Sequence, residues 1–179
     1  MTSHQLEIAH VQTITPAAGV DKSTFFAIMG AYPTGVTIVT TLDADGQPKG
    51  LTSNAVCSVS AEPPLLLVCV DKRSNTLPAL LHARKFVVNY LATGRGELSN
   101  LFASKEPDKF ADVAWRPASN GMPLLHADAL AHAECTTIQE IDAGDHTVLI
   151  GSVDAGQPPE PGTLPLMYFR RTYSTWSDG

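Results

Sequence analysis

One stretch, residues 49–70, constrains the fold of this chain more than any other. It ends in an apolar run, residues 65–70, which directly follows a Glu-Pro-Pro turn at 62–64. An apolar run of this length bounded by turn residues is typical of a buried strand. The half before the turn instead carries hydroxyls and an amide. Small polar side chains leave the backbone accessible to a flat polar ligand, although a solvent-facing edge strand explains the same pattern.

Length and charge restrict the function classes. The chain has 179 residues with an ordinary globular balance of 44% apolar and 17% charged residues, which is enough for one domain with a sizeable core. A formal net charge of −6 argues against a general nucleic-acid binder, which needs a basic face. No apolar run reaches the length of a membrane span, and the N-terminus does not resemble a signal peptide.

The cysteines and histidines give no sign of a metal site. Cys57, Cys69 and Cys135 are odd in number, and no two of them have metal-ligand spacing. Their apolar or small neighbours predict three buried, reduced thiols, which suits a cytoplasmic protein. The six histidines show no ligand spacing either.

The N-terminal region is predicted to contain one helix. Residues 1–20 have no clear period, and we interpret them as an arm suited to packing on a partner subunit. Residues 21–179 follow as a single domain. Asp21 or Ser23 can cap a helix that ends near Gly30 and carries an apolar face. A Pro-Thr-Gly turn at 33–35 comes next.

The rest of the chain is rich in predicted strands. Short helices are expected only at 77–82 and 97–103, and residues 104–125 form a long irregular segment. The predicted strands, besides those of the opening stretch, are 36–42, 85–91, 131–141, 147–153 and 164–169. Regular βαβ alternation and a GxGxxG loop after a strand are both missing, which argues against a Rossmann sheet. The pattern favours an all-β domain, an antiparallel Greek-key barrel with helices over its ends.

Two polar turns are candidates for chemistry. Lys72, Arg73 and Ser74 precede a predicted helix start, where cations and free N–H groups suit a phosphate, although a solvated basic turn is the simpler interpretation. Lys109, in the irregular segment, could add a positive contact. A Gly-Asp-His turn places His146 at the start of a strand, where it can point into a cleft or remain exposed on a capped turn.

Taken together, these pieces resemble the flavin reductases of two-component flavin-dependent monooxygenases, a family with the FMN-binding split-barrel fold. The most specific motifs are TSNAVCSVSAEPP at 52–64 and AGDH at 143–146. The other matching segments are 25–40, 45–51, 65–70, 72–76, 86–91, 98–110, 121–125, 133–153 and 165–173. The resemblance covers nearly everything from about residue 22 onward, in order.

The resemblance implies an antiparallel split barrel, a homodimer, and a flavin (FAD or FMN) held near the dimer interface. The residues it assigns to the ring and ribityl chain are Pro33, Thr34, Thr52, Ser53, Asn54, Ala55, Ser58, Val59 and Ser60. Those it places toward the phosphate are Lys72, Arg73, Ser74, Thr76, Phe102, Ala103 and Lys109. His146 resembles the residue beside the nicotinamide, with Tyr168, Phe169 and Tyr173 as aromatic neighbours. Val56 departs from the aromatic residue that many members carry at this position.

The resemblance further implies an enzyme that transfers hydride from NADH to flavin and supplies reduced flavin to a partner monooxygenase. NADH is predicted over NADPH, because the sequence shows no obvious second basic cluster for an adenosine phosphate. Positioning of two rings is then the main catalytic requirement, which agrees with the absence of a catalytic triad motif. The alternatives are a non-catalytic flavin carrier on the same barrel and an enzyme resembling pyridoxamine-phosphate oxidases. The second would need a richer Arg/Lys cluster for its phosphorylated amine substrate.

Overall fold

The computed structural model of the protein describes residues 19–176. The arm predicted over residues 1–20 therefore lies, apart from its last two residues, outside the described residues. None of the helices between residues 19 and 176 is long and apolar enough to cross a membrane.

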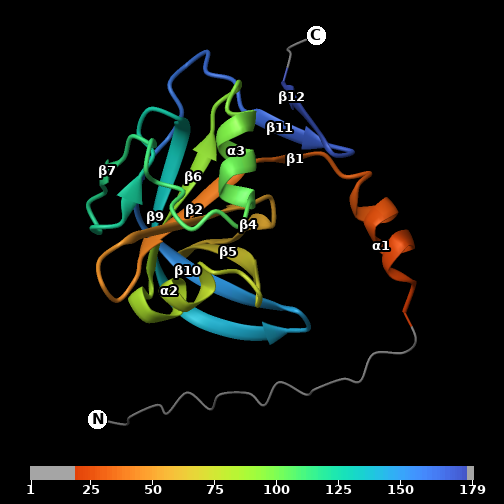
Figure 1. Ribbon diagram of the computed structural model, residues 1–179, viewed down its shortest axis with the longest axis horizontal. Coiled ribbons are helices and arrows are strands. Elements are labelled where there is room, and N and C mark those ends of the chain that lie inside the picture. The colour runs from red at the N-terminus through yellow and green to blue at the C-terminus, as the bar shows by residue number, and fades with distance from the viewer. Residues whose placement is uncertain (1–18, 177–179) are drawn as a thin grey trace.

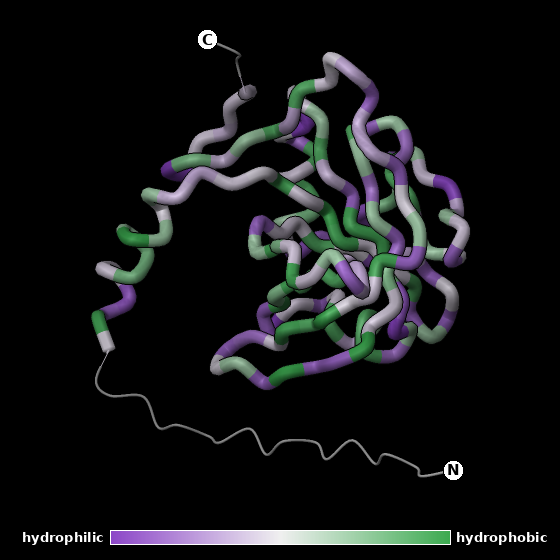
Figure 2. The backbone as a smooth tube through the Cα atoms, turned by 180° about the vertical axis from the view of Figure 1, so that it is seen from behind, coloured by the Kyte–Doolittle hydropathy of each residue, from purple (hydrophilic) through white to green (hydrophobic). Residues whose placement is uncertain are grey.

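Helix α1, Lys22–Met29, stands apart from the body of the molecule (Figures 1 and 2). Its predicted cap is confirmed, because the Asp21 carboxylate accepts hydrogen bonds from the backbone N–H groups of Ser23 at 2.9 Å and Thr24 at 3.0 Å. None of its residues is buried, although Phe25, Phe26, Ile28 and Met29 are large and apolar. The helix is therefore capped at its N-terminus and leaves apolar surface uncovered.

A seven-stranded antiparallel sheet forms the body, in the order β3-β2-β6-β9-β10-β5-β4. Its strands are β2 (Thr37–Leu42), β3 (Pro48–Ser53), β4 (Val56–Ala61), β5 (Pro64–Asp71), β6 (Lys85–Leu91), β9 (Ala129–Ala143) and β10 (His146–Gln157). The sheet curls around a core but does not close, since its edge strands β3 and β4 are not paired with each other. The predicted antiparallel split barrel is confirmed.

A smaller sheet lies beside the barrel, in the order β1-β11-β12 (Figure 1). Its strands are β1 (Thr34–Gly35), β11 (Leu166–Phe169) and β12 (Thr172–Thr175). The Pro-Thr-Gly segment at 33–35, predicted as a turn, thus contributes a short strand, because β11 returns from far along the chain to pair with it. Strand β12 in the tail was not predicted. The segment 104–125 contains a hairpin of β7 (Arg116–Pro117) and β8 (Pro123–Leu124).

Two short helices match the prediction closely. Helix α2 spans Leu77–Ala83 with Pro78 in its first turn, where the missing N–H is tolerated. Helix α3 spans Gly96–Ala103 and lies against the sheet, where its closest neighbour is β3. This contact positions α3 beside the beginning of the polar half of residues 49–70.

Strand alternation decides which cysteines are buried. Along β5, Leu66, Val68 and Val70 point into the core, so Cys69 between them lies on the other face and is only half-buried. Cys57 is exposed on the edge strand β4, and only Cys135 is buried, which raises the pKa of its thiol to about 12. The prediction of three buried thiols was therefore wrong for Cys57 and Cys69. The residues next to Cys57 in the sequence did not show that its side chain would lie on an outer face.

A buried polar knot joins the barrel to the hairpin segment. Asn89, fully buried on β6, donates to the Ile38 carbonyl and the Thr40 hydroxyl, each at 3.0 Å. Its side-chain oxygen accepts a hydrogen bond from the Leu125 N–H at 2.9 Å. The Thr40 hydroxyl in turn donates to the Pro123 carbonyl. These bonds tie the segment after β8 to β2 and β6, which pair in the main sheet.

We expect Asn89→Ala to lower the free energy of unfolding by about 2–4 kcal/mol, because it leaves the buried Leu125 N–H unsatisfied and opens a cavity. Urea denaturation followed by circular dichroism measures the effect. Gln47→Ala, which removes the same kind of side chain from an exposed hairpin, is the control and should change stability by less than about 0.5 kcal/mol. An equal, small loss in both variants would show that the knot adds nothing to stability.

Candidate functional site

Three neighbouring hollows form one cleft along the side of the barrel. The basic hollow, of about 470 Å³, is lined by Leu51, Thr52, Asp71, Arg73, Ser74, Asn75, Phe102, Ala103, Ser104, Lys105 and Lys109. The aromatic hollow, of about 180 Å³, is lined by Val36, Thr52, Asn54, Ser99, Ala103, Tyr168 and Tyr173. The outer hollow, of about 750 Å³, lies between α1 and the β11–β12 turn. Thr52 and Ala103 line both of the first two, and Asn54 and Tyr168 line both of the last two.

The wall of the basic hollow depends on the absence of a side chain at Gly50. The Phe102 ring of α3 packs so closely on β3 that a Cβ at Gly50 would meet the ring Cε1 at 2.6 Å. Phe102 also packs edge-on against Phe110, with 5.0 Å between ring centroids. The Gly50 carbonyl accepts hydrogen bonds from the Thr76 hydroxyl at 2.9 Å and from Lys109 Nζ at 3.3 Å. Gly50 thus brings α3, the start of α2 and Lys109 to one place.

Lys109 is a half-buried cation without an acidic partner among the described residues. Its ammonium donates to the carbonyls of Phe102 at 2.7 Å and Gly50 at 3.3 Å. Burial, followed by repulsion from Lys105, lowers the pKa of Lys109. Lys105 lines the same hollow and donates to the Arg73 carbonyl at 3.2 Å. A bound anion would relieve both effects on Lys109, so the hollow suits a negatively charged group.

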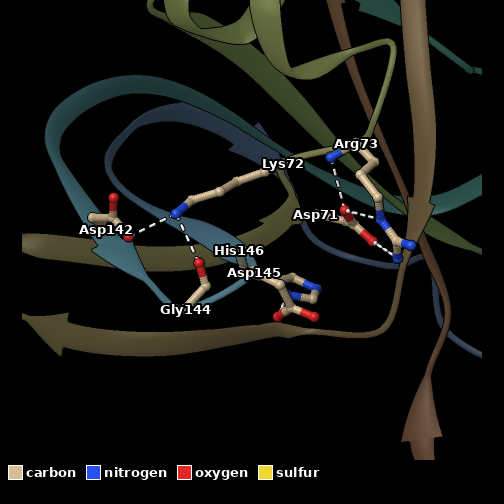
Figure 3. A network of polar contacts seen from close by, with 7 residues as sticks. All are labelled: Asp71, Lys72, Arg73, Asp142, Gly144, Asp145 and His146. Atoms are coloured by element: carbon tan, nitrogen blue, oxygen red, sulfur yellow. Dashed lines mark hydrogen bonds and ion pairs between the residues drawn. The ribbon is translucent and has the colours of Figure 1, made fainter. Parts of the chain in front are cut away.

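Lys72 and Arg73 point in different directions (Figure 3). Lys72 Nζ lies 2.7 Å from both the Asp142 carboxylate and the Gly144 carbonyl, at the turn between β9 and β10. Arg73 faces the basic hollow and pairs with Asp71, at 2.7 Å between Nη2 and Oδ2. This pairing holds the pKa of the Asp71 carboxyl well below its usual range and raises that of Arg73. Lys72 is therefore directed away from the hollow that Arg73 lines.

The aromatic hollow combines two tyrosines with three polar side chains, those of Thr52, Asn54 and Ser99. The rings of Tyr168 and Tyr173 lie 5.3 Å apart, centroid to centroid, at an angle of 52°. The Tyr173 hydroxyl is held on α3 by the hydroxyl of Ser99 at 2.9 Å and by the side-chain oxygen of Asn100 at 3.0 Å. Asn54 donates to the Thr34 hydroxyl at 3.3 Å. This end of the cleft offers an aromatic surface with a few fixed polar groups, which suits a flat ring.

His146 begins β10 directly opposite Asp71 of β5. Its Nδ1 lies 2.7 Å from the Asp145 carboxylate, and this hydrogen bond is the main cause that lowers the pKa of Asp145. The imidazole lies beside the Asp145 carboxylate (Figure 3), and it does not line any of the three hollows. The structure therefore does not bring His146 together with the tyrosines of the aromatic hollow within one chain.

The predicted site residues divide into those that line the cleft and those that do not. Those that line the cleft are Thr52, Asn54, Arg73, Ser74, Phe102, Ala103, Lys109, Tyr168 and Tyr173. Those that do not line it are Pro33, Thr34, Ser53, Ala55, Ser58, Val59, Ser60, Lys72, Thr76, His146 and Phe169. Ser53 and Thr76 are buried, while Ser58 and Val59 are exposed on the edge strand β4.

Sequence reasoning missed several cleft residues. Lys105 lies in the irregular segment, and its only signal was proximity to Lys109. Arg170 and Arg171, together with residues of α1, line the outer hollow. The aromatic residues on both sides of the two arginines had been assigned to the nicotinamide, but nothing indicated the contribution of α1, because the fold brings the two segments together only through the pairing of β1 with β11. Within residues 19–176, no three His, Cys, Asp or Glu side chains group as metal ligands.

Comparison with known protein families identifies one match. The family model described as "Flavin reductase like domain" matches residues 29–177, which is most of the chain. The match includes the whole barrel and every strand of the cleft.

Individual relatives agree. The chain is 53% identical over 158 residues to a flavin reductase (NADH) from Kitasatospora aureofaciens, covering 88% of this chain and 83% of the relative. It is 36% identical to HsaB, the reductase subunit of a flavin-dependent monooxygenase from Mycobacterium tuberculosis. This match covers 88% of this chain and 84% of HsaB. Among solved structures, NADH:FAD oxidoreductase SgcE6 from Streptomyces globisporus, in complex with NAD and FAD fragments, superposes with a TM-score of 0.82. Its sequence is 31% identical, covering 90% of this chain and 98% of that one.

Proposed function

We propose that this chain, which belongs to the flavin reductase-like domain family, reduces flavin with a nicotinamide dinucleotide as the donor. The observation that carries the proposal is the shape and chemistry of the cleft. One end has a half-buried ammonium without an acidic partner in the described chain, and the other has a pair of tyrosines. A flavin nucleotide has the same polarity, with a phosphate at one end and an aromatic ring at the other.

The residues of the cleft fit a flavin. Lys109, Lys105 and Ser74 would hold the phosphate in the basic hollow, and Asn54 with Tyr168 would border the ring. When bound, flavin supplies the redox chemistry by accepting a hydride. The chain itself contributes binding, orientation and the exclusion of water. Its fixed polar groups, such as the Tyr173 hydroxyl anchored to α3, keep the cleft in shape without rearrangement.

The cleft residues proposed for the flavin serve its ring and its first phosphate, which FMN and FAD share. We therefore propose that both flavins are accepted. We propose NADH as the donor, supported by the name of the relative that is 53% identical. The Asp145 carboxylate orients the imidazole of His146, which does not reach the aromatic hollow within one chain. We therefore propose that His146 faces the donor from the second subunit of a homodimer.

A monooxygenase component is the proposed recipient of the reduced flavin. The support is that HsaB, 36% identical to this chain, is named as the reductase subunit of a flavin-dependent monooxygenase.

Anaerobic stopped-flow mixing of the protein with NADH and an excess of FAD or FMN tests the function directly. We expect the absorbance of oxidised flavin to be lost over many turnovers, because the protein need only bring donor and acceptor together. Binding of flavin without bleaching by NADH or NADPH would refute the reductase and leave a flavin carrier. The ratio of the two rates gives the flavin preference.

Substitution of Lys109 and of Lys72, one at a time, tests where the flavin phosphate binds. We expect Lys109→Met to weaken FMN binding by about 10- to 100-fold, because a charge-assisted hydrogen bond to the phosphate is lost. Lys72→Met removes the same charge from the side chain that faces Asp142 instead, and it should change the Kd by less than about two-fold. Fluorescence titration measures both. A larger loss in Lys72→Met would place the phosphate at the β9–β10 turn.

We also propose that the protein is a homodimer. The support is α1, which leaves Phe25 and Ile28 at least half exposed on a helix that stands apart from the barrel. Such a concentration of exposed apolar side chains is unusual for a monomer. Neither residue lines the outer hollow, so both are available to a second subunit.

The double substitution Phe25→Ser and Ile28→Ser should increase the dimer dissociation constant by about 100-fold or more, because two large apolar side chains leave the interface. Light scattering after size-exclusion chromatography at several concentrations gives the constant. Ser23→Ala with Thr24→Ala, two exposed residues on the same helix, is the control for loss of the helix itself, since these side chains only supplement the Asp21 cap. A wild-type protein that is monomeric at all concentrations would contradict the proposal.

A further inference from the structure

The turn between β11 and β12 consists of two arginines in an unusual backbone conformation. Phe169 pairs with Thr172, so Arg170 and Arg171 alone make the connection. Their φ angles are 47° and 65°, both in the left-handed region. Two-residue hairpins of this kind favour Asn and Gly, since other residues adopt positive φ at a cost in free energy. An Arg-Arg pair is therefore an unfavourable choice for the turn alone.

Neither guanidinium has an acidic partner in the described part of the chain, since no Asp or Glu between residues 19 and 176 forms an ion pair with Arg170 or Arg171. Arg170 lies over the Phe169 ring, with its central carbon 5.0 Å from the ring centroid. In a chain with a formal net charge of −6, two adjacent unpaired cations are a local exception. They leave up to ten N–H donors available to an anionic ligand.

The two arginines line the outer hollow, opposite α1. No carboxylate is among the residues that line it in the described part of the chain. Phe26 and Tyr32 of the facing wall are 50% and 68% exposed, so their rings are accessible to a flat base. A cationic edge facing an aromatic wall is the combination that suits a nucleotide with its phosphates.

The outer hollow continues into the proposed flavin site. Asn54 and Tyr168 line both the outer and the aromatic hollow. A dinucleotide with its reactive ring near Tyr168 would therefore have its second half directed toward the arginine turn. The basic hollow, at the other end of the cleft, would take the flavin phosphate, so the two cationic sites would not compete for one group.

We propose that Arg170 and Arg171 bind the phosphates on the adenosine half of the nicotinamide dinucleotide, with Phe26 and Tyr32 against the adenine. This proposal rests on the proposed function, since it assumes that dinucleotides use the cleft. It revises the expectation that the chain has no second basic cluster for an adenosine phosphate. The adenosine half and its phosphates are present in NADH and NADPH, and they are absent from FMN and from reduced nicotinamide mononucleotide. In FAD they adjoin the flavin phosphate, which we assign to the basic hollow at the other end of the cleft.

The variant that tests the site is Arg170→Asn with Arg171→Gly. It removes both charges and introduces the residues that the turn prefers, so the hairpin should fold at least as well, with an unchanged or higher Tm. Arg116→Gln is the matched control, because Arg116 is an exposed arginine on β7, outside the three hollows.

Calorimetric titration with ADP-ribose measures the site without flavin or turnover. We expect the double variant to bind ADP-ribose at least about 10-fold more weakly than the wild type, and Arg116→Gln to bind it normally. Equal binding by wild type and double variant would overturn the proposal. Since this readout needs no catalysis, it can succeed even if flavin reduction is not found.

Kinetic measurements then distinguish the source of the adenosine half. With FMN as acceptor, a KM for NADH or NADPH raised in the double variant, together with an unchanged KM for reduced nicotinamide mononucleotide, assigns the site to the donor. That result supports the proposal. A raised Kd for FAD with an unchanged KM for NADH and NADPH would overturn it, because the adenosine half of the acceptor would then lie at the arginine turn. An equal change for mononucleotides and dinucleotides would overturn it, while continued reduction of FMN would leave the proposed function standing.

Discussion

The contact between Phe102 and the backbone of Gly50 is the constraint on which the cleft depends. It fixes α3 against β3, and no other residue type at position 50 would allow the ring to lie so close. The carbonyl of Gly50 stays reachable and accepts from both Thr76 and Lys109. One small residue thus couples the packing of the helix, the start of α2 and the position of the cation that we assign to the phosphate. A substitution here would disturb the core and the site together.

The half-buried state of Lys109 follows from this packing. Among the described residues its ammonium meets only carbonyl dipoles, which stabilise the charge less than a carboxylate would. The protein therefore keeps a cation in a partly desolvated place at some cost to its own stability. Such an arrangement is favourable once an anion binds, because the desolvation has already occurred and both charges are then paired.

The sequence was sufficient to predict the barrel and part of the site. Strands such as β6 were predicted with correct bounds because apolar and β-branched periodicity is a local property. The direction of the Lys72 side chain could not be predicted, since it depends on Asp142, a residue 70 positions away on the neighbouring hairpin. The arginine turn was missed for a similar reason. Arg170 and Arg171 become part of a cleft only when β11 pairs with β1 and faces them toward α1.

Helix α1 contributes both to the proposed dimer interface and to the proposed site for the adenosine half. Its residues Phe26 and Met29 line the outer hollow, whereas Phe25 and Ile28 do not. A helix of eight residues that buries none of its own side chains has little to hold it in place. A partner subunit packed on Phe25 and Ile28 would fix the helix and, with it, the wall that faces the arginine turn. In that arrangement dimerisation and binding of the adenosine half would be linked, because each stabilises the same position of α1.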